Sequence, residues 1–329
     1  MTTPPPVAAE YAPLPHPPVP YAPSPALGPP VVPPAEPRSY VHQMRGPRYR
    51  WWRPVLALGI ATVTFAVLIA VVMAGFLITG AVPMDGSEPD MLAPGGFLSG
   101  NLMIGALLPA TLVGLWAGFG VRPGRVFCVA GRMRWGWLGR CLALIAPLWA
   151  AYVGLSWVVG GGEIKERPEH WLGLLVVALL STPLQAAAEE VAFRGGLVQG
   201  FGAWFRSPVA ALVVTTFLSA GLFALAHGSL DVWILIDLGF MAAAGCWLSW
   251  RTGGLEAIIA LHVANNLLVT AAGLALGGLE DAYVDTGVTS TPGQAGASVL
   301  ATTVVVLVLL RLARRRGIAP LGWRAPAVG

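Results

Sequence analysis

The chain has 329 residues, of which 56% are hydrophobic and 11% are charged, and its formal net charge is +4. Soluble domains carry about 25% charged residues. This composition, with successive apolar runs of about twenty residues, excludes a soluble globular protein and predicts an integral membrane protein. The positive charge does not indicate nucleic-acid binding, because the basic residues gather in the loops between apolar runs. The lipid bilayer is therefore the first predicted partner.

The first 50 residues form a proline-rich leader that ends in a basic collar. Residues 1–37 are rich in Pro and Ala and cannot bury enough apolar surface to fold, so we expect disorder with polyproline II character. A docking segment for a proline-binding partner is the alternative. A leader of this kind before the first apolar run predicts that there is no cleavable signal peptide. The collar is expected to be cytoplasmic and next to the membrane, with its tryptophans at headgroup level, and its residues are Arg45, Arg48, Arg50, Trp51, Trp52 and Arg53.

Eight apolar runs follow in order and predict an all-α fold, a polytopic membrane helix bundle of about eight transmembrane helices. The loops after the second, fourth, sixth and eighth runs carry arginines, whereas the loops after the first and seventh are acidic and lack Lys and Arg. By the positive-inside rule, both termini are cytoplasmic. The approximate bounds of the runs are 54–82, 100–120, 137–159, 171–188, 208–226, 232–250, 255–276 and 297–310.

Three cysteines, Cys128, Cys141 and Cys246, are scattered without CxxC spacing. They predict neither a disulfide framework nor a thiolate metal site.

A few ionisable residues stand within or at the ends of the apolar runs and are candidates for a functional site. An acidic side chain at mid-membrane costs about 2.5–3.5 kcal/mol. Glu190 and Arg194 are four residues apart and can pair on one helical face. Glu189 is rotated by about 100° from Glu190 and lacks that partner. We therefore predict a structural Glu190–Arg194 pair and a reactive Glu189. The other members are His227, Asp237, Glu256 and His262.

Two of these residues are expected to have ordinary roles. Asp237 is expected to pair within the bundle, and Glu256 is expected to sit near the membrane interface. Ordinary roles also remain open for three others. The Glu190–Arg194 pair could serve solely to neutralise charge in the bundle, and His227 could cap a helix end.

The remaining polar groups supply the parts of a hydrolytic site. A carboxylate with a His can hold and deprotonate a water, and a second His with an Asn can stabilise the oxyanion formed at a carbonyl. Asn266 lies four residues after His262, on the same helical face. Asn265 is the competing amide, and Asn266 itself could instead serve only to bond two helices. Such a set suffices for peptide hydrolysis without a covalent intermediate.

A zinc site is the alternative use of the same groups. Glu189, His227 and His262 could ligate Zn²⁺ and leave a fourth position for water. The chain has no HExxH motif. Activation of water without a metal is therefore the favoured prediction.

Three fragments resemble, in order, the motifs of the CPBP family of intramembrane proteases, also called the CAAX-protease or Abi family, which includes the eukaryotic prenyl-protein-processing endopeptidase. EExxxR matches Glu189, Glu190 and Arg194; FxxxH matches Phe223 and His227; HxxxN matches His262 and Asn266. The resemblance covers about residues 171–276. It implies that Glu189 and His227 activate water, and that His262 and Asn266 act at the oxyanion or at a metal.

With this resemblance, the chain divides into four parts: the leader with its collar (1–50), the N-terminal transmembrane helices (51–160), a catalytic helix core (161–280), and the last helix with a basic tail (281–329). The predicted function is an intramembrane endopeptidase acting on a membrane protein or peptide. The alternatives are a membrane scaffold or bacteriocin-immunity-type protein, and a proton-coupled transporter.

Composition and geometry add two expectations. Much Ala, Gly, Pro and Arg with little Lys suits a high-GC bacterium, so the plasma membrane of a bacterium is the predicted location and prenyl-protein processing is not expected. If the fifth run were a straight span, His227 would lie on the outer side and Glu189 toward the inner half. That run must therefore be short, tilted or re-entrant for the two to share a water.

Overall fold

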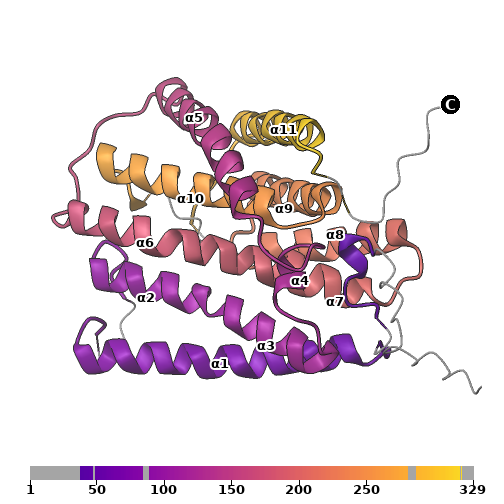
Figure 1. The fold of residues 1–329 in the computed structure, drawn as a ribbon. Coiled ribbons are helices and arrows are strands. Elements are labelled where there is room, and N and C mark those ends of the chain that lie inside the picture. The colour runs from indigo at the N-terminus through magenta and orange to yellow at the C-terminus, as the bar shows by residue number, and fades with distance from the viewer. Residues whose placement is uncertain (1–37, 47–48, 84–88, 281–286, 319, 321–329) are drawn as a thin grey trace, which may run out of the picture. The chain divides into compact units, whose positions relative to one another are not determined.

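The computed structural model describes residues 38–46, 49–83, 89–280, 287–318 and 320. Within these residues the chain is helical apart from its loops and an isolated β-bridge between Cys128 and Gly254 (Figure 1). This confirms the all-α prediction. The predictions for the proline-rich leader, Arg48, the acidic residues Asp85, Glu88, Asp281 and Asp285, and the tail from residue 321 lie outside the described residues.

Within the described residues, eight helical segments are long and apolar enough to cross a membrane, as the sequence predicts. The fourth is longer than predicted and runs to Gly202, and the eighth is extended at both ends. The spans are α1 (Arg53–Thr79), α2 with α3 (Pro94–Gly105 and Leu107–Phe119), α5 (Trp135–Val159), α6 with η2 and α7 (Trp171–Glu190, Val191–Leu197 and Val198–Gly202), α8 (Pro208–Leu225), α9 (Val232–Thr252), α10 (Glu256–Leu276) and α11 (Pro292–Arg315); α4 (Gly124–Phe127) and the 3₁₀ turn η1 (Tyr40–His42) complete the set.

Local capping chemistry fixes where the helices near the candidate site begin and end. At the start of α9, the Asp231 carboxylate accepts hydrogen bonds from the backbone N–H groups of Trp233 and Ile234, at 2.9 and 3.0 Å. At its end, Gly253 has a φ of 71°, a left-handed conformation that favours glycine. The short turn that follows sends the chain directly into α10.

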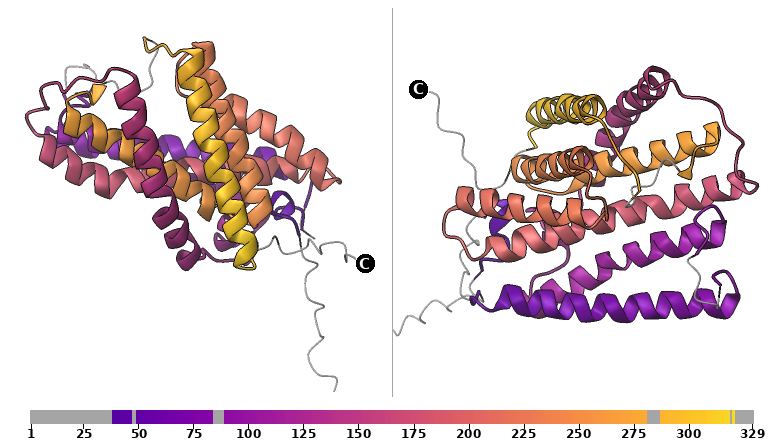
Figure 2. Two further views of the ribbon diagram at one scale, coloured as in Figure 1. Left: turned by 90° about the horizontal axis from the view of Figure 1, so that it is seen from above. Right: turned by 180° about the vertical axis from the view of Figure 1, so that it is seen from behind.

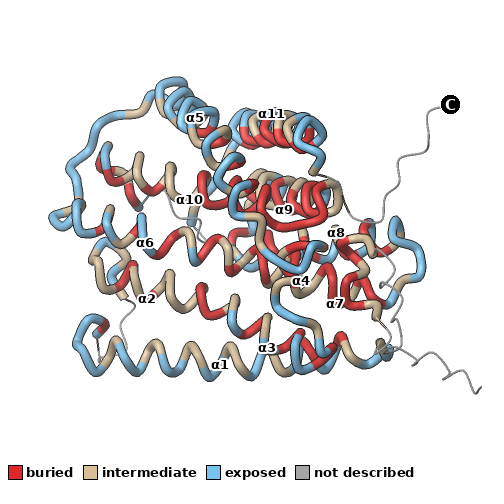
Figure 3. The backbone as a smooth tube through the Cα atoms, in the orientation of Figure 1, coloured by how far each residue is buried: buried red, intermediate tan, exposed pale blue. Residues whose placement is uncertain are grey.

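Helix α10 is the central helix of the bundle. It packs against α5 on one side and α6 on another, and it also contacts α9. Figure 3 shows buried residues concentrated on α10, α9 and the α6–α7 segment, whereas α1 is mostly exposed. Exposed valines on α1, including Val63, Val67 and Val71, suit a lipid-facing surface. The motif residues therefore lie in the most enclosed part of the chain.

The pairing of α1 with α3 depends on two glycines. A Cβ atom at Gly114 would clash with the backbone carbonyl of Ala57, and one at Gly118 would lie 2.6 Å from the Ala57 Cβ. Small residues of this kind let two membrane helices approach closely.

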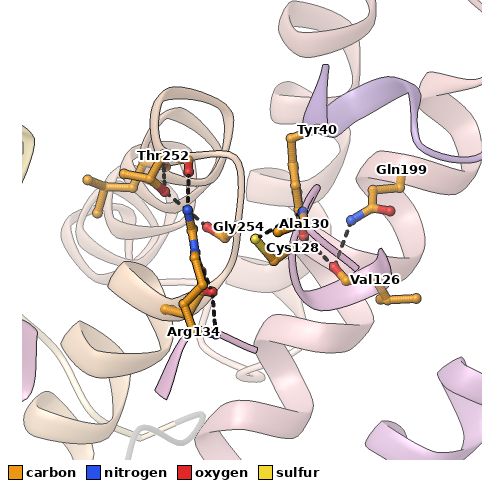
Figure 4. Close-up of polar contacts among 10 residues, drawn as sticks. Tyr40, Val126, Cys128, Ala130, Arg134, Gln199, Thr252 and Gly254 are labelled. Carbon is orange, nitrogen blue, oxygen red and sulfur yellow. Dashed lines mark hydrogen bonds and ion pairs between the residues drawn. The ribbon is translucent and has the colours of Figure 1, made fainter. Parts of the chain in front are cut away.

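The segment that precedes α1 differs from the expectation of a collar on the membrane surface. The Tyr40 side chain is buried, and its hydroxyl donates to the Val126 carbonyl at 2.9 Å. The Gln199 amide donates to the same carbonyl at 2.8 Å, as Figure 4 shows. Tyr40 thus joins α7 and the α3–α5 connection inside the protein.

The basic and aromatic residues of the collar divide into two groups. The Arg45 guanidinium donates to the carbonyls of Ala203 and Phe205 at 2.8 and 3.0 Å, so it serves the end of α7 rather than lipid headgroups. Trp51 and Trp52 are exposed, as a position at headgroup level requires. The sequence did not indicate these contacts of Arg45, because charge counting does not detect backbone acceptors supplied by a distant segment.

Candidate functional site

The first motif lies where the α6 helix changes its winding. Residues Val191–Leu197 form the π-helix η2, which continues directly from Glu190 at the end of α6. Such π segments inside α-helices are frequent at functional sites. Within it, a Cβ at Gly195 would lie 2.7 Å from a Val126 methyl, and one at Gly196 would lie 2.7 Å from the Thr111 methyl. Glycine therefore lets the neighbouring helices hold this segment closely.

The predicted pair between Glu190 and Arg194 is present and fully buried. Arg194 Nη1 lies 3.1 Å from Glu190 Oε1, and neither side chain is accessible to solvent. The guanidinium carbon also lies 4.4 Å from the centre of the Phe223 ring on α8, a cation–π geometry. A Cβ at Gly245 of α9 would approach Arg194 Nε to 3.3 Å, so α9 leaves room for the guanidinium.

His262 on α10 contacts both glutamates. Its Nδ1 lies 2.8 Å from Glu190 Oε1 in a hydrogen bond, and its Nε2 lies 3.3 Å from Glu189 Oε2. The sequence analysis left Glu189 without a partner and placed His262 at the oxyanion, so this bridge was not predicted. If Nδ1 carries a hydrogen for Glu190, then Nε2 and the Glu189 carboxylate face each other across one proton.

Several polar atoms of this cluster have no hydrogen-bond partner in the described part of the chain. They are Glu189 Oε2, Glu190 Oε2 and the three guanidinium nitrogens of Arg194, one of which is the ion-pairing Nη1. Buried polar groups are almost always hydrogen-bonded. The cluster thus has polar atoms that its internal hydrogen bonds do not use.

His227 lies next to this cluster but is not part of it. Its Nδ1 lies 2.8 Å from the Phe223 carbonyl, one turn earlier. Because a carbonyl only accepts, Nδ1 donates and Nε2 is left as an acceptor. The Phe223 ring contacts His227 and His262, with centroid distances of 4.8 and 5.8 Å. Among the described residues, no hydrogen bond or ion pair joins His227 to Glu189.

The lengths of two helical segments explain how the first two motifs come close together. The span that carries Glu189 continues for 32 residues from Trp171 to Gly202, so the carboxylates lie near its middle. Helix α8 has only 18 residues. Phe223, in its last turn, reaches Arg194 and His262. Helix α8 therefore ends with His227 within one aromatic side chain of the buried cluster.

A chain of amide hydrogen bonds extends from the third motif. Asn266 Nδ2 donates to Gln185 Oε1 at 3.1 Å, and Asn265 Nδ2 donates to Asn266 Oδ1 at 2.9 Å. Trp149 Nε1 of α5 donates to Asn265 Oδ1 at 3.1 Å. Gln185 and Trp149 were missed in the sequence analysis. Gln185 lies four residues before Glu189 on the same helical face, and this spacing could have indicated it as a site residue. No sequence pattern indicates Trp149.

Glu256, at the start of α10, has a partner that the sequence did not indicate. Its side chain is fully buried and paired with Arg134. Arg134 Nε and backbone N–H donate to Oε1 at 2.8 and 3.0 Å, and Nη2 donates to Oε2 at 2.7 Å. Arg134 Nη1 donates to the Thr252 carbonyl, the residue toward which Arg134 points in Figure 4. This pair fastens the α9–α10 turn to the start of α5.

The remaining intramembrane carboxylate, Asp237, has a partner within the bundle, as expected. Its Oδ1 accepts a hydrogen bond of 2.6 Å from the Ser298 hydroxyl of α11. It lies apart from the glutamate cluster and joins α9 to α11.

The donors expected for zinc do not converge in this arrangement. Among the described residues, no three His, Cys, Asp or Glu side chains form a group that could hold a metal ion. His262 already contacts both carboxylates, and His227 is separated from them by Phe223. The positions of these residues therefore do not fit the predicted zinc site with three protein ligands.

Comparison with known proteins bears on the same region. Residues 170–268 match a family model described as type II CAAX prenyl endopeptidase Rce1-like. The uncharacterized protein YyaK of Bacillus subtilis (strain 168) is 30% identical over 106 residues, 30% of this chain and 34% of YyaK. The match thus spans about a third of that relative's length. No solved structure gives a significant match.

The matched residues include Glu189, Glu190, Arg194, His262 and Asn266, together with the Phe223–His227 turn. The motifs, the eight membrane helices and the family match agree. Residues 170–268 thus match the Rce1-like family model, which agrees with the resemblance to CAAX-protease-type membrane proteins seen in the sequence.

Proposed function

We propose that the protein is an intramembrane endopeptidase that hydrolyses a peptide bond with a water activated by Glu189. The observation that carries the proposal is the bridging position of His262, 2.8 Å from Glu190 and 3.3 Å from Glu189. The hydrogen bond to Glu190 orients the imidazole, whose Nε2 then lies beside a Glu189 oxygen that accepts no hydrogen bond in the described part of the chain. A general base needs such a position, in reach of a water and of the substrate carbonyl.

The proposed reaction proceeds in two steps. In the first, Glu189 takes a proton from the water, the water oxygen bonds to the carbonyl carbon, and the carbonyl electrons move onto its oxygen. In the second, the carbonyl re-forms, the C–N bond breaks, and the Glu189 acid gives its proton to the leaving nitrogen. His227, whose Nε2 is an acceptor, helps to hold the water.

The oxyanion is stabilised by donors from α10 in this proposal. The Asn266 amide nitrogen has two hydrogens, of which Gln185 accepts one; the other is available to the substrate oxygen. Protonated His262 supplies a second donor through Nε2, because Glu190 holds its Nδ1. Donors arranged in advance of the reaction can contribute several kcal/mol to transition-state stabilisation.

The location and orientation follow from the charge pattern. We infer that the protein resides in the plasma membrane of a bacterium with both termini in the cytoplasm. The Arg-rich loop after α3, Arg251 in the last turn of α9 and the basic end of α11 support this orientation. The substrate is a membrane protein or a membrane-inserted peptide, since the site lies among transmembrane helices.

The test compares the purified wild type with Glu189→Gln. Each is incubated in detergent with a pool of peptides and membrane-protein fragments, with and without a chelator, and products are identified by mass spectrometry. We expect Glu189→Gln to reduce cleavage by about 10²–10⁴-fold, the usual contribution of a general base. The matched control is Glu169→Gln, which alters an exposed loop glutamate and should cleave normally.

Each other result has a defined meaning. Equal cleavage by the wild type and Glu189→Gln would exclude Glu189 as the base. Loss of cleavage on chelation, with about one zinc bound per chain, would make His227 and His262 metal ligands. A wild type that binds peptides but cleaves none would favour a membrane scaffold.

A further inference from the structure

A second polar feature lies in the membrane region, away from the glutamate cluster. A cavity of about 1270 Å³ is formed by α5, α9, α11 and the residues just before α11. Figure 2 shows α5 and α11 side by side at this part of the bundle. Its wall is largely apolar with a few hydroxyl groups and one carboxylate. Residues that define it are Tyr152, Leu155, Ile234, Asp237, Ser298 and Ala301.

Asp237 is the acidic group of this cavity, and its charge is not balanced there. Its Oδ1 accepts a hydrogen bond from Ser298. Of the described residues that line the cavity, none is a Lys, Arg or His. A carboxylate among apolar side chains is costly unless it is paired. A ligand with a cationic group at this position would supply the missing charge.

The size of the cavity suits a short length of helix. A helix with its side chains is about 10–12 Å in diameter and rises 1.5 Å per residue. A cavity of this volume therefore accommodates roughly ten residues of one helix, about half a membrane span. The open wall between α5 and α11 is formed by exposed apolar side chains such as Leu155 and Leu300, which suit contact with a second helix.

The depth of Asp237 favours a helix over a lipid headgroup. Asp237 is five residues into α9, which places it about 7–8 Å along the helix from Val232. A lipid amine stays at the membrane surface. A lysine or arginine on a transmembrane helix carries its charge on a long flexible stem, which can extend along an apolar wall to such a group.

We propose that this cavity binds a transmembrane helix of the substrate and that Asp237 selects a helix with a lysine or arginine near one end. The identification of the helix as substrate rests on the proposed function; its binding does not. Tyr152 in the cavity wall stacks on Trp149 at a centroid distance of 5.2 Å, and Trp149 donates to Asn265, which bonds to Asn266. The occupant thus contacts Tyr152, the first residue in a series of contacts that leads to the oxyanion donor.

The test measures binding rather than cleavage. Two synthetic helices of about 20 Leu and Ala residues are used, one with a single lysine near one end and one with norleucine there. The protein carries Glu189→Gln and sits in lipid nanodiscs, with a photo-crosslinking amino acid at Leu155 in the cavity or at Leu180, an exposed residue of α6 that does not line it. We expect the lysine helix to crosslink at position 155 at least five times more than the norleucine helix.

The role of Asp237 is tested by two variants. Asp237→Asn should remove the preference for lysine, and Asp237→Glu should retain it; thermal unfolding checks that each is folded. Equal labelling of both helices, labelling at position 180 as strong as at position 155, or labelling of lipid alone would overturn the proposal. Helix binding in the cavity without cleavage by the wild type would support the cavity proposal and reject the proposed endopeptidase function. Cleavage by the wild type without labelling in the cavity would support the endopeptidase function and overturn the cavity proposal.

Discussion

The protein buries two glutamate–arginine pairs that differ in how fully their polar atoms are used. Both carboxylate oxygens of Glu256 accept hydrogen bonds from Arg134. In contrast, Glu190 and Arg194 meet at 3.1 Å, while Glu190 Oε2 and the guanidinium nitrogens find no hydrogen-bond partner in the described chain. The first pair is complete within the protein, whereas the second leaves atoms for something else to bind.

This difference distinguishes the two pairs where burial does not, because Glu256 and Glu190 are equally inaccessible. Glu256 accepts three hydrogen bonds, all from Arg134. Glu190 shares its Oε1 between Arg194 and His262, and its Oε2 accepts none in the described part of the chain. We expect substitutions at the first pair to cost more stability than those at the second.

The largest effect on stability is expected for Arg134→Ala. It leaves Glu256, whose side chain is 0% exposed, without a partner. Breaking a buried ion pair in this way costs about 3–5 kcal/mol. Thermal unfolding in detergent should show a lower midpoint than for any single variant of the second pair.

The double variant Arg134→Ala with Glu256→Gln is the control. Removing the charge of both partners relieves the buried unpaired carboxylate, so the double variant should recover part of the lost stability. A double variant that unfolds even more readily than Arg134→Ala would contradict the view that the unpaired charge causes the loss.

A smaller loss is expected for Arg194→Ala, about 1–3 kcal/mol. Glu190 keeps a partner after this change, because His262 Nδ1 remains 2.8 Å away and the imidazole can carry the positive charge. The cation–π contact with Phe223 is also lost. The folded yield and unfolding midpoint should lie between those of Arg134→Ala and the wild type, and Glu190→Ala should behave similarly. If Arg194→Ala matched Arg134→Ala, His262 would not be compensating the charge.

The same contrast explains what the sequence could predict. The eight spans follow from run length and charge, which the bilayer dictates directly. The Glu190–Arg194 pair follows from a spacing of four on one helix. The partner of Glu256, however, is 122 residues away in the chain, and Trp149 is 116 residues from Asn265. Periodicity cannot detect pairings that depend on how two separate helices meet.

The π-helix at Val191–Leu197 was missed for a related reason. Its apolar and glycine residues fit an ordinary helix equally well, and the change in winding depends on close contacts with Val126 and Thr111. Likewise, the burial of Tyr40 depends on an acceptor at Val126, which no local charge pattern indicates. Local chemistry thus selected the candidate residues, and tertiary packing determined the contacts between them.

The smallest effect on stability is expected for Glu189→Ala, within about 0.5 kcal/mol of the wild type. Its side chain is 12% exposed, and its contact with His262 is an ion-pair distance of 3.3 Å without hydrogen-bond geometry. Removing it also takes one negative charge away from the neighbouring Glu190. The unfolding midpoint should therefore hardly change. If Glu189→Ala were instead more destabilising than Glu190→Ala or Arg194→Ala, Glu189 would be the structural carboxylate, and Glu190, with its free Oε2, would become the candidate base.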